Sequence, residues 1–213
     1  MLTRALEFNQ EDKIYFQHLG YQTLTIPLTA IHYRQFSAVT RCQLQVSEWL
    51  FFTSQTPVDL VLPLLATTCK IAVIGEKTAA CVRSYGIEPT FISPFPNKKA
   101  MIAAFKKQYP QPTTIFYPKS QLADCFVENQ LQVTHQVTAV IAYENRCPPA
   151  SSALLAEALS QNLLTAAYFA SPSAWHRFAR VYQSNPQPLT FFAIGATTQA
   201  AIQAAGYSAT IIH

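Results

Sequence analysis

Short apolar runs alternate with longer stretches of mixed polarity along the whole chain. The runs are rich in aromatic and β-branched side chains, as strands buried on both faces of a parallel sheet are. They cover residues 24–31, 49–52, 71–74, 114–117, 137–143, 166–169 and 191–194. The stretches between them carry apolar residues at helical spacing and cover residues 11–19, 78–85, 98–109, 121–130, 150–162, 173–182 and 197–205. The alternation predicts an α/β fold built on parallel sheets.

Two parts of the chain, about half its length apart, repeat one pattern of a strand, a corner with hydroxyl groups and a second strand. The first copy is strand 49–52, Thr53 and Ser54, then Ile74, Gly75, Thr78 and Gly86. The second copy is strand 166–169, Ser171 and Ser173, then Ile194, Gly195, Thr198 and Gly206. The spacing from Gly to Thr and from Gly to the later Gly is the same in both copies. This duplication predicts two similar half-molecules. The later glycines, together with Gly20, are expected to end helices in the left-handed conformation.

Composition limits the class of protein. Hydrophobic residues make up 50% of the 213 residues and charged residues 12%, yet no apolar run approaches the roughly 18 to 20 residues that span a bilayer. The first residues lack the apolar stretch of a signal peptide, so we expect a soluble, cytoplasmic protein with no membrane contact. The five cysteines show no metal-binding spacing, so we expect reduced thiols with neither a disulfide nor zinc.

The charge is mildly positive, with 15 basic and 11 acidic residues and a formal net charge of +4. The densest basic stretch, residues 98–107, is interpreted as a solvated helix face. Nucleic-acid binding would need a clustered basic face with exposed aromatic residues, whereas the basic residues here are spread along the chain. A polyanionic small ligand suits this mild excess of positive charge.

Several catalytic and cofactor motifs are absent from the sequence. The chain has only five glycines and holds neither a P-loop nor a GxGxxG sequence, which argues against a nucleotide cofactor. It also lacks a close pair of acids for glycoside hydrolysis, a Gly-x-Ser-x-Gly elbow and an HExxH zinc motif. A generic flavodoxin-like cofactor binder therefore has no supporting loop in this sequence.

Hydroxyl side chains stand at the predicted corners between strands and helices, at Ser54, Thr78, Ser171 and Thr198. In a parallel α/β sheet these corners lie at the edge where ligands bind, and each following helix presents unpaired N–H groups with a partial positive charge. Such corners stabilise an anion without a charged side chain. Serine and threonine are also preferred helix caps, so the same residues would appear in a protein that binds nothing.

In their order and spacing, these motifs resemble the uroporphyrinogen-III synthase family over nearly the whole chain. The matching segments are residues 2–4, Gly20, and residues 26–27, 50–54, 73–75, 78–79, 142–145, 169–173, 193–195 and 197–198. The resemblance implies two flavodoxin-like parallel-sheet domains joined by a two-stranded β linker, with the active site in the interdomain cleft. The first domain would be discontinuous, with residues 1–30 and 146–213. The second would cover residues 32–138, and the linker strands about 27–33 and 138–145.

The resemblance implies a lyase of tetrapyrrole biosynthesis, which leads to heme, siroheme and cobalamin. Its substrate would be hydroxymethylbilane, a linear polycarboxylate that is cyclised to uroporphyrinogen III with loss of water and inversion of ring D. It implies no metal or organic cofactor, a monomer, and a transient contact with hydroxymethylbilane synthase. The alternative is a two-lobed polycarboxylate-binding or regulatory protein of the same fold with weakened catalysis.

The resemblance also assigns the site residues. Tyr143 matches a tyrosine of the family's cleft, where its phenol would hydrogen-bond or protonate the departing hydroxyl; the alternative is a tyrosine that only packs in the linker. The substrate-binding residues would be Arg4, Thr53, Ser54, Gly75, Thr78, Lys119, Ser171, Ser173, Gly195, Thr197 and Thr198. For Arg4 a structural salt bridge is the alternative, and Lys119 stands where the family is variable.

Two features depart from the family's pattern. The chain ends at His213, directly after the apolar residues 210–212, where family members usually continue into another loop and helix. Gln55, Thr56 and Pro57 replace the more usual small and Asn or Gly residues after the Thr53-Ser54 corner. Either departure fits an altered cleft or a compact family member.

Overall fold

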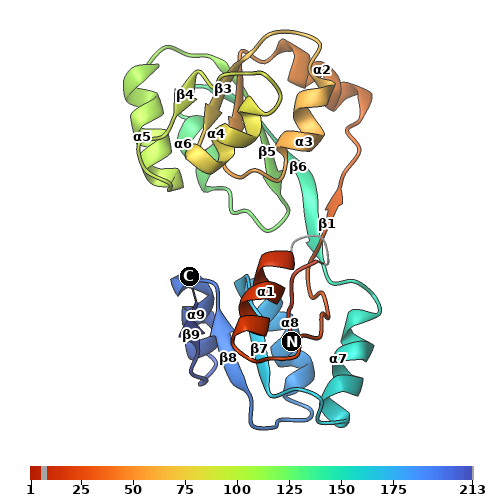
Figure 1. Ribbon diagram of the computed structural model, residues 1–213. Helices are drawn as coiled ribbons and strands as arrows, with labels where there is room; N and C mark the ends of the chain where they lie inside the picture. Colours follow the sequence, from red (N-terminus) through yellow and green to blue (C-terminus); the bar gives the residue numbers. More distant parts are fainter. Residues whose placement is uncertain (6–8, 213) are drawn as a thin grey trace. The chain divides into compact units, whose positions relative to one another are not determined.

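The chain folds into two compact units, each built around its own parallel sheet. The computed structural model describes residues 1–5 and 9–212, so His213 lies outside the described residues. Unit 1 consists of Met1–Ile31 and Asn145–His213, and unit 2 consists of His32–Glu144. Figure 1 shows the helices and strands of each unit.

The sheet of unit 2 contains parallel strands in the order β6-β5-β2-β3-β4, and β1 (Ala30–Tyr33) lies beside β6 at its edge. The strands are β2 (Trp49–Phe52), β3 (Lys70–Val73), β4 (Phe91–Ile92), β5 (Thr114–Ser120) and β6 (Gln136–Arg146). Leu50 of β2 pairs with both Ile71 and Phe116. Because β2 is central, all four of its side chains are buried.

Helices cover both faces of this sheet. One face carries α2 (Ala38–Val46), α3 (Val58–Val61), the short 3₁₀ helix η2 (Leu62–Leu64) and α4 (Glu76–Arg83), which pack on Leu50 and Phe52. The other face carries α5 (Lys98–Gln108) and α6 (Phe126–Leu131), which pack on Trp49 and Phe51. Neighbouring residues of β2 belong to different cores because successive side chains of a strand point to opposite faces.

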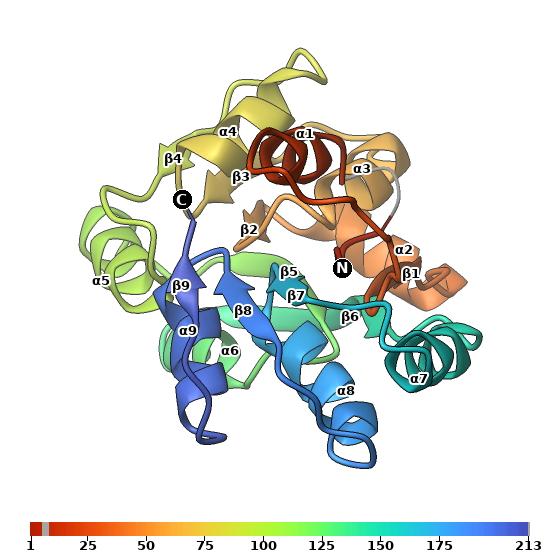
Figure 2. The same cartoon turned by 60° about the horizontal axis from the view of Figure 1, so that its bottom comes forward.

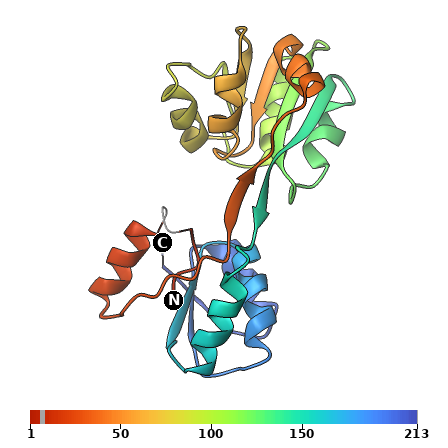
Figure 3. The same cartoon turned by 90° about the vertical axis from the view of Figure 1, so that its right-hand side faces the viewer.

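In unit 1, β7 (Ala166–Phe169), β8 (Thr190–Ala193) and β9 (Thr210–Ile211) lie side by side and parallel, as Figure 2 shows. Leu2 pairs in parallel with Tyr168 of β7 and with Thr25. The helices α7 (Ser151–Ser160), α8 (Pro172–Tyr182) and α9 (Ala196–Gln203) pack on one face of these strands. The other face carries α1 (Gln10–His18), whose Phe16 packs on Leu2 and Tyr168; Figure 3 shows α1 and α7 on opposite sides of unit 1.

The two sheets have the same spatial order but a different order along the chain. Unit 1 runs Thr25, Leu2, β7, β8, β9, and unit 2 runs β6, β5, β2, β3, β4. The repeated sequence pattern makes β2, β3 and β4 the counterparts of β7, β8 and β9. The first two positions come from the start of the chain in unit 1 and from the last two strands in unit 2, so unit 2 is a circular permutation of unit 1. Counted along the chain, unit 1 has the strand order 2-1-3-4-5 of flavodoxin-like sheets.

The structure confirms the α/β fold and most of the predicted elements. The predicted strands 49–52 and 166–169 have the expected bounds. Gly20, Gly86 and Gly206 have φ values of 84°, 74° and 86°, which confirms the expected left-handed helix ends. In the part of the chain that the structure describes, no helix combines the length and apolar character that a bilayer crossing requires.

Two predicted elements differ from the structure, and one helix of the structure was not predicted. The strand predicted at 24–31 is divided, because Ile26 and Leu28 donate backbone hydrogen bonds to Leu2 and Thr3 whereas β1 begins only at Ala30. The predicted start of the helix at 121–130 was wrong. The Ser120 Oγ accepts a bond from the backbone N–H of Leu122, which forms a turn, and α6 begins at Phe126. Helix α2 was not predicted because only Leu44 of its residues is buried, which leaves little helical periodicity.

Candidate functional site

The corner that follows β2 and β3 in unit 2 carries the first copy of the repeated pattern. Thr53 and Ser54 follow the last residue of β2, and the N–H of Ile74 donates to the carbonyl of Phe52 at 3.0 Å, which holds the two strand ends together. Gly75 is the N-cap of α4. Thr78 lies in the first turn of α4, is 3% exposed, and donates its backbone N–H to Gly75 at 3.1 Å.

Unit 1 repeats this corner bond for bond. The N–H of Ile194 donates to the carbonyl of Phe169 at 3.0 Å, and Gly195 is the N-cap of α9. Thr198 is 2% exposed and donates its N–H to Gly195 at 3.1 Å, while the neighbouring Thr197 is exposed. The duplication read from the sequence is therefore a duplication of local structure.

The structure separates capping from other roles at these corners. The Ser171 Oγ accepts a hydrogen bond from the N–H of Ala174 at 3.2 Å, so it is the N-cap of α8. Thr78 and Thr198 do not cap, because the N-cap positions of α4 and α9 are Gly75 and Gly195, which have no side chain to accept a bond. The first N–H groups of a helix have no partner within it, so these two helix starts can donate to an anion.

Tyr143 lies near the end of β6 and reaches the serine corner of unit 2. Its phenol oxygen is 3.1 Å from the Oγ of Ser54, and either group can be the donor. The ring packs in the core with Phe52 and Phe116, and the side chain is 9% exposed. Since β2 and β6 run in parallel within one sheet, their carboxyl ends share an edge, which explains how residues far apart in sequence meet here.

Thr53 makes an equivalent contact with a second tyrosine. The Thr53 Oγ1 and the phenol oxygen of Tyr117 on β5 are 3.2 Å apart. Tyr117 is fully buried, and this burial raises the pKa of its phenol to about 12. Tyr117 therefore remains a neutral hydrogen-bonding group at physiological pH.

The serine corner of unit 1 contacts β6 near its end. The Oγ atoms of Ser171 and Ser173 are 3.0 Å apart, and the Nδ2 of Asn145 lies 3.5 Å from Ser173. Arg177 on α8 donates through Nη1 to the Oδ1 of Asn145 at 2.8 Å and to the carbonyl of Leu28 at 2.6 Å. It also donates through Nη2 to the carbonyl of Asn145 at 2.5 Å. The guanidinium thus ties α8 to the two segments that lead out of unit 1.

The two predicted cationic residues both form ion pairs. The Nη1 of Arg4 lies 3.5 Å from the Oδ2 of Asp12, which is buried. Lys119 is paired with Glu128 and donates to the carbonyl of Asp124 at 3.0 Å; both charged side chains of the pair are 10% exposed. The contact expected of each with substrate stays a prediction, but each has a structural role in its own unit.

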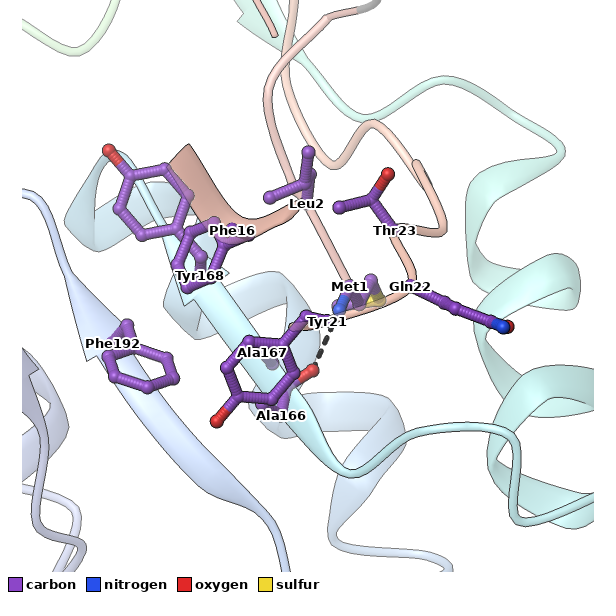
Figure 4. Close-up of a pocket in the computed structure, with 10 residues that line it drawn as sticks. All are labelled: Met1, Leu2, Phe16, Tyr21, Gln22, Thr23, Ala166, Ala167, Tyr168 and Phe192. Atoms are coloured by element: carbon purple, nitrogen blue, oxygen red, sulfur yellow. Dashed lines mark hydrogen bonds between the residues drawn. The ribbon is translucent and has the colours of Figure 1, made fainter. Parts of the chain in front are cut away.

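A small cavity in unit 1 is lined by Met1, Leu2, Phe16, Tyr21, Gln22, Thr23, Ala166, Ala167, Tyr168 and Phe192, which Figure 4 shows. Its volume is about 10 Å³, which is the space of one water molecule at most. The amino group of Met1 donates to the carbonyl of Ala166 at 2.7 Å. This cavity is too small for an organic substrate.

The side chains that could bind a metal ion are dispersed over the two units. Over residues 1–5 and 9–212, no three His, Cys, Asp or Glu side chains are grouped to hold a metal ion. The five cysteines, Cys42, Cys69, Cys81, Cys125 and Cys147, are all free thiols. The chemistry available at the corners is therefore that of hydroxyl groups, backbone N–H groups and phenols.

The sequence model of the uroporphyrinogen-III synthase HemD family matches residues 11–213. The chain belongs to this family. No curated protein sequence matches it. A mutant uroporphyrinogen III synthase of the extremely thermophilic bacterium Thermus thermophilus is similar in fold, with a TM-score of 0.70 and 15% identity over 99% of this chain and 91% of that one. A wild-type structure from the same organism has a TM-score of 0.52 and 16% identity over 99% and 90%.

For a member of the uroporphyrinogen-III synthase family, sequence reasoning missed three residues beside the predicted site. Tyr117 ends the apolar run predicted at 114–117, and its position at a strand end was the signal that could have identified it. Glu144 follows Tyr143 in the matching segment 142–145 and is paired with Arg34. Arg177 had no such signal. No motif surrounds it in the sequence, and an arginine in a helix is usually a surface residue.

Proposed function

We propose that this chain is a uroporphyrinogen-III synthase that cyclises hydroxymethylbilane with loss of water and inversion of ring D. Family membership supplies the reaction class. The observation that carries the proposal is the phenol of Tyr143, 3.1 Å from the Ser54 hydroxyl at a corner suited to anions. The proposed enzyme is a cofactor-independent lyase that acts as a monomer and takes its substrate in a transient contact with hydroxymethylbilane synthase.

Carboxylate binding is assigned to the corners of each unit. The substrate is a polycarboxylate, and the helices α4 and α9 begin after the glycine caps Gly75 and Gly195, so the N–H groups that precede those of Thr78 and Thr198 can donate to a carboxylate. The hydroxyl groups of Thr53, Ser54, Thr78, Ser171, Thr197 and Thr198 would add donors, and Ser173 lies in hydrogen-bond contact with Ser171. Such a site binds several carboxylates at modest strength each, without the entropy cost of ordering many arginines.

Catalysis would consist mainly of holding the bilane in the reactive arrangement. The linear substrate closes spontaneously to the non-inverted isomer, so the enzyme must direct attack to the substituted carbon of the last ring, and orientation is the main source of such selectivity. The phenol of Tyr143 would donate a proton to the departing hydroxyl, which leaves as water. Ser54, whose Oγ can donate to the phenol oxygen, would stabilise the negative charge left on it. The proton that the substrate loses when the new ring bond is complete would return to the phenolate and restore the phenol.

The product isomer tests this function. Hydroxymethylbilane is supplied to the purified protein, and the cyclised products are separated into the type I and type III isomers. We expect type III to predominate at a rate above spontaneous closure. Type I alone at the spontaneous rate contradicts the synthase and favours a polycarboxylate-binding protein of the same fold.

The duplicated threonines provide a test of carboxylate binding. Thr78→Val and Thr198→Val keep the volume of two buried side chains and remove one hydroxyl each. We expect each to raise KM for hydroxymethylbilane by about tenfold with a small change in kcat, as the loss of one hydrogen bond to a charged group does. Thr165→Val is the matched control, because Thr165 is exposed and precedes β7 at the opposite edge of the sheet. Equal KM values for all three variants would contradict a binding role for the corner threonines.

A further inference from the structure

A chain of hydrogen bonds connects Arg177 to the serine corner of unit 1. The Nη1 of Arg177 donates to the Oδ1 of Asn145 at 2.8 Å, and the Nδ2 of Asn145 faces the Oγ of Ser173 at 3.5 Å. The Oγ of Ser173 is 3.0 Å from that of Ser171, which accepts from the N–H of Ala174 at 3.2 Å. Arg177 and the two serines belong to α8 or its cap, so the network bridges a helix start to the end of β6.

The direction of this chain follows from the chemistry of its first member. A guanidinium has five donors and no acceptor, and it stays protonated in proteins even though burial lowers the pKa of Arg177. The oxygen of the Asn145 amide must therefore face Arg177. The NH2 group of the same amide must then face Ser173 as a donor.

The amide orientation leaves the Ser173 proton free to point at Ser171, because the Ser173 oxygen accepts from Asn145; either hydroxyl can be the donor in the contact between the two serines. When Ser173 donates, the Ser171 oxygen accepts two bonds, from Ser173 and from the N–H of Ala174, which use both of its lone pairs. In that arrangement the Ser171 proton has no acceptor within this network, so the Ser171 hydroxyl can donate to a ligand.

We propose that Arg177 is a positioning residue that, through Asn145 and Ser173, orients the Ser171 hydroxyl to donate to a carboxylate of the substrate. This inference rests on the proposed function and adds a role for Arg177 and Asn145, to which no contact with the substrate is assigned. If Ser171 served only as the N-cap of α8, its oxygen would accept from the N–H of Ala174 whichever way its proton pointed. The proposal therefore predicts a substrate effect when the direction of the chain is reversed without loss of the cap.

Asn145→Asp reverses the chain. The carboxylate still accepts from Arg177, but it cannot donate to Ser173, so Ser173 donates to it instead and Ser171 must donate to Ser173. The substrate then loses a donor. We expect KM for hydroxymethylbilane to rise about tenfold, kcat to stay within about twofold, and the melting temperature to stay at the wild-type value.

A double-mutant cycle separates this effect from simple charge repulsion. Ser171→Gly removes the hydroxyl, and glycine at an N-cap costs little stability. We expect Ser171→Gly and the double variant Asn145→Asp/Ser171→Gly each to raise KM about tenfold, because both changes act on one hydrogen bond. Charge repulsion by the new carboxylate would instead multiply with the loss of the hydroxyl and give about a hundredfold increase in the double variant.

The control is Arg180→Gln, one turn further along α8, where an exposed arginine is removed and the net charge falls by the same amount as in Asn145→Asp. We expect its KM to stay near the wild-type value. An additive cycle, or the same KM for Asn145→Asp and Arg180→Gln, overturns this inference while wild-type formation of type III still supports the synthase. Type I alone from the wild-type protein overturns both.

Discussion

Tyr143→Phe is expected to lower kcat for formation of the type III isomer by about 100-fold, the smaller end of what a positioned general acid contributes. The substitution removes one oxygen, which lies 3.1 Å from the Ser54 Oγ, and leaves a ring that still packs in the core of unit 2. KM should change little because the phenol of Tyr143 is not among the groups that we assign to carboxylate binding. The measurement is the initial rate of each isomer, and type I from spontaneous closure should dominate the product.

The control for this substitution is Tyr85→Phe in the same unit. Tyr85 also loses a phenol hydrogen bond, to the Oδ1 of Asp59 at 2.9 Å, but its side chain is exposed. We expect the Tyr85 variant to retain the wild-type rate. If Tyr143→Phe also retains it while folding normally, Tyr143 packs in the sheet and donates no proton to the substrate.

Lys119→Met is expected to lower the free energy of unfolding by about 3 kcal/mol. The substitution leaves the carboxylate of Glu128 buried without its cation, and one oxygen of that carboxylate already has no hydrogen-bond partner among the described residues. The double variant Lys119→Met/Glu128→Leu removes both charges and should recover most of the loss. Denaturant unfolding of the three proteins measures this difference.

An exposed ion pair serves as the control for the stability measurement. Lys98→Met breaks the pair with Asp124, where Asp124 is largely exposed, and should leave stability nearly unchanged. A loss of unfolding free energy no larger in Lys119→Met than in Lys98→Met would contradict a structural role for the buried pair.

The double variant Lys119→Met/Glu128→Leu separates structure from substrate binding. An unchanged KM for this variant assigns Lys119 to structure alone, whereas a raised KM supports the predicted contact with substrate.

The strands and the duplication were well predicted because they depend on local pattern. Residues 49–52 are all apolar, and a central parallel strand buries every side chain, so the composition of this strand predicts its central position in the sheet. The repeated glycines predicted helix ends because few other residues adopt positive φ. Helix α2 was not predicted because it buries only Leu44, and a helix with one buried residue has almost no apolar periodicity.

The corner residues were identified as a class, but their individual roles were not. Ser, Thr and Gly at a strand-to-helix corner are compatible with capping, with anion binding and with both. The structure assigns the cap of α8 to Ser171 and leaves Thr78 and Thr198 inside their helices, because glycines occupy the cap positions of α4 and α9. This distinction depends on the residue at which each helix begins. That residue is set by backbone geometry and can differ by one position without any change in composition.

By itself, the sequence determined the α/β class, the duplication, the family and the set of polar residues at the corners, since each of these follows from periodicity, spacing and residue type along the chain. Only the tertiary structure decided which of them meet. Tyr143 and Ser54 are 89 residues apart, and Arg177 and Asn145 are 32 apart, so no local pattern could pair them. The structure also showed that unit 2 is a circular permutation of unit 1, because the pairing of strands is a matter of spatial order, which the one-dimensional order of the chain does not specify.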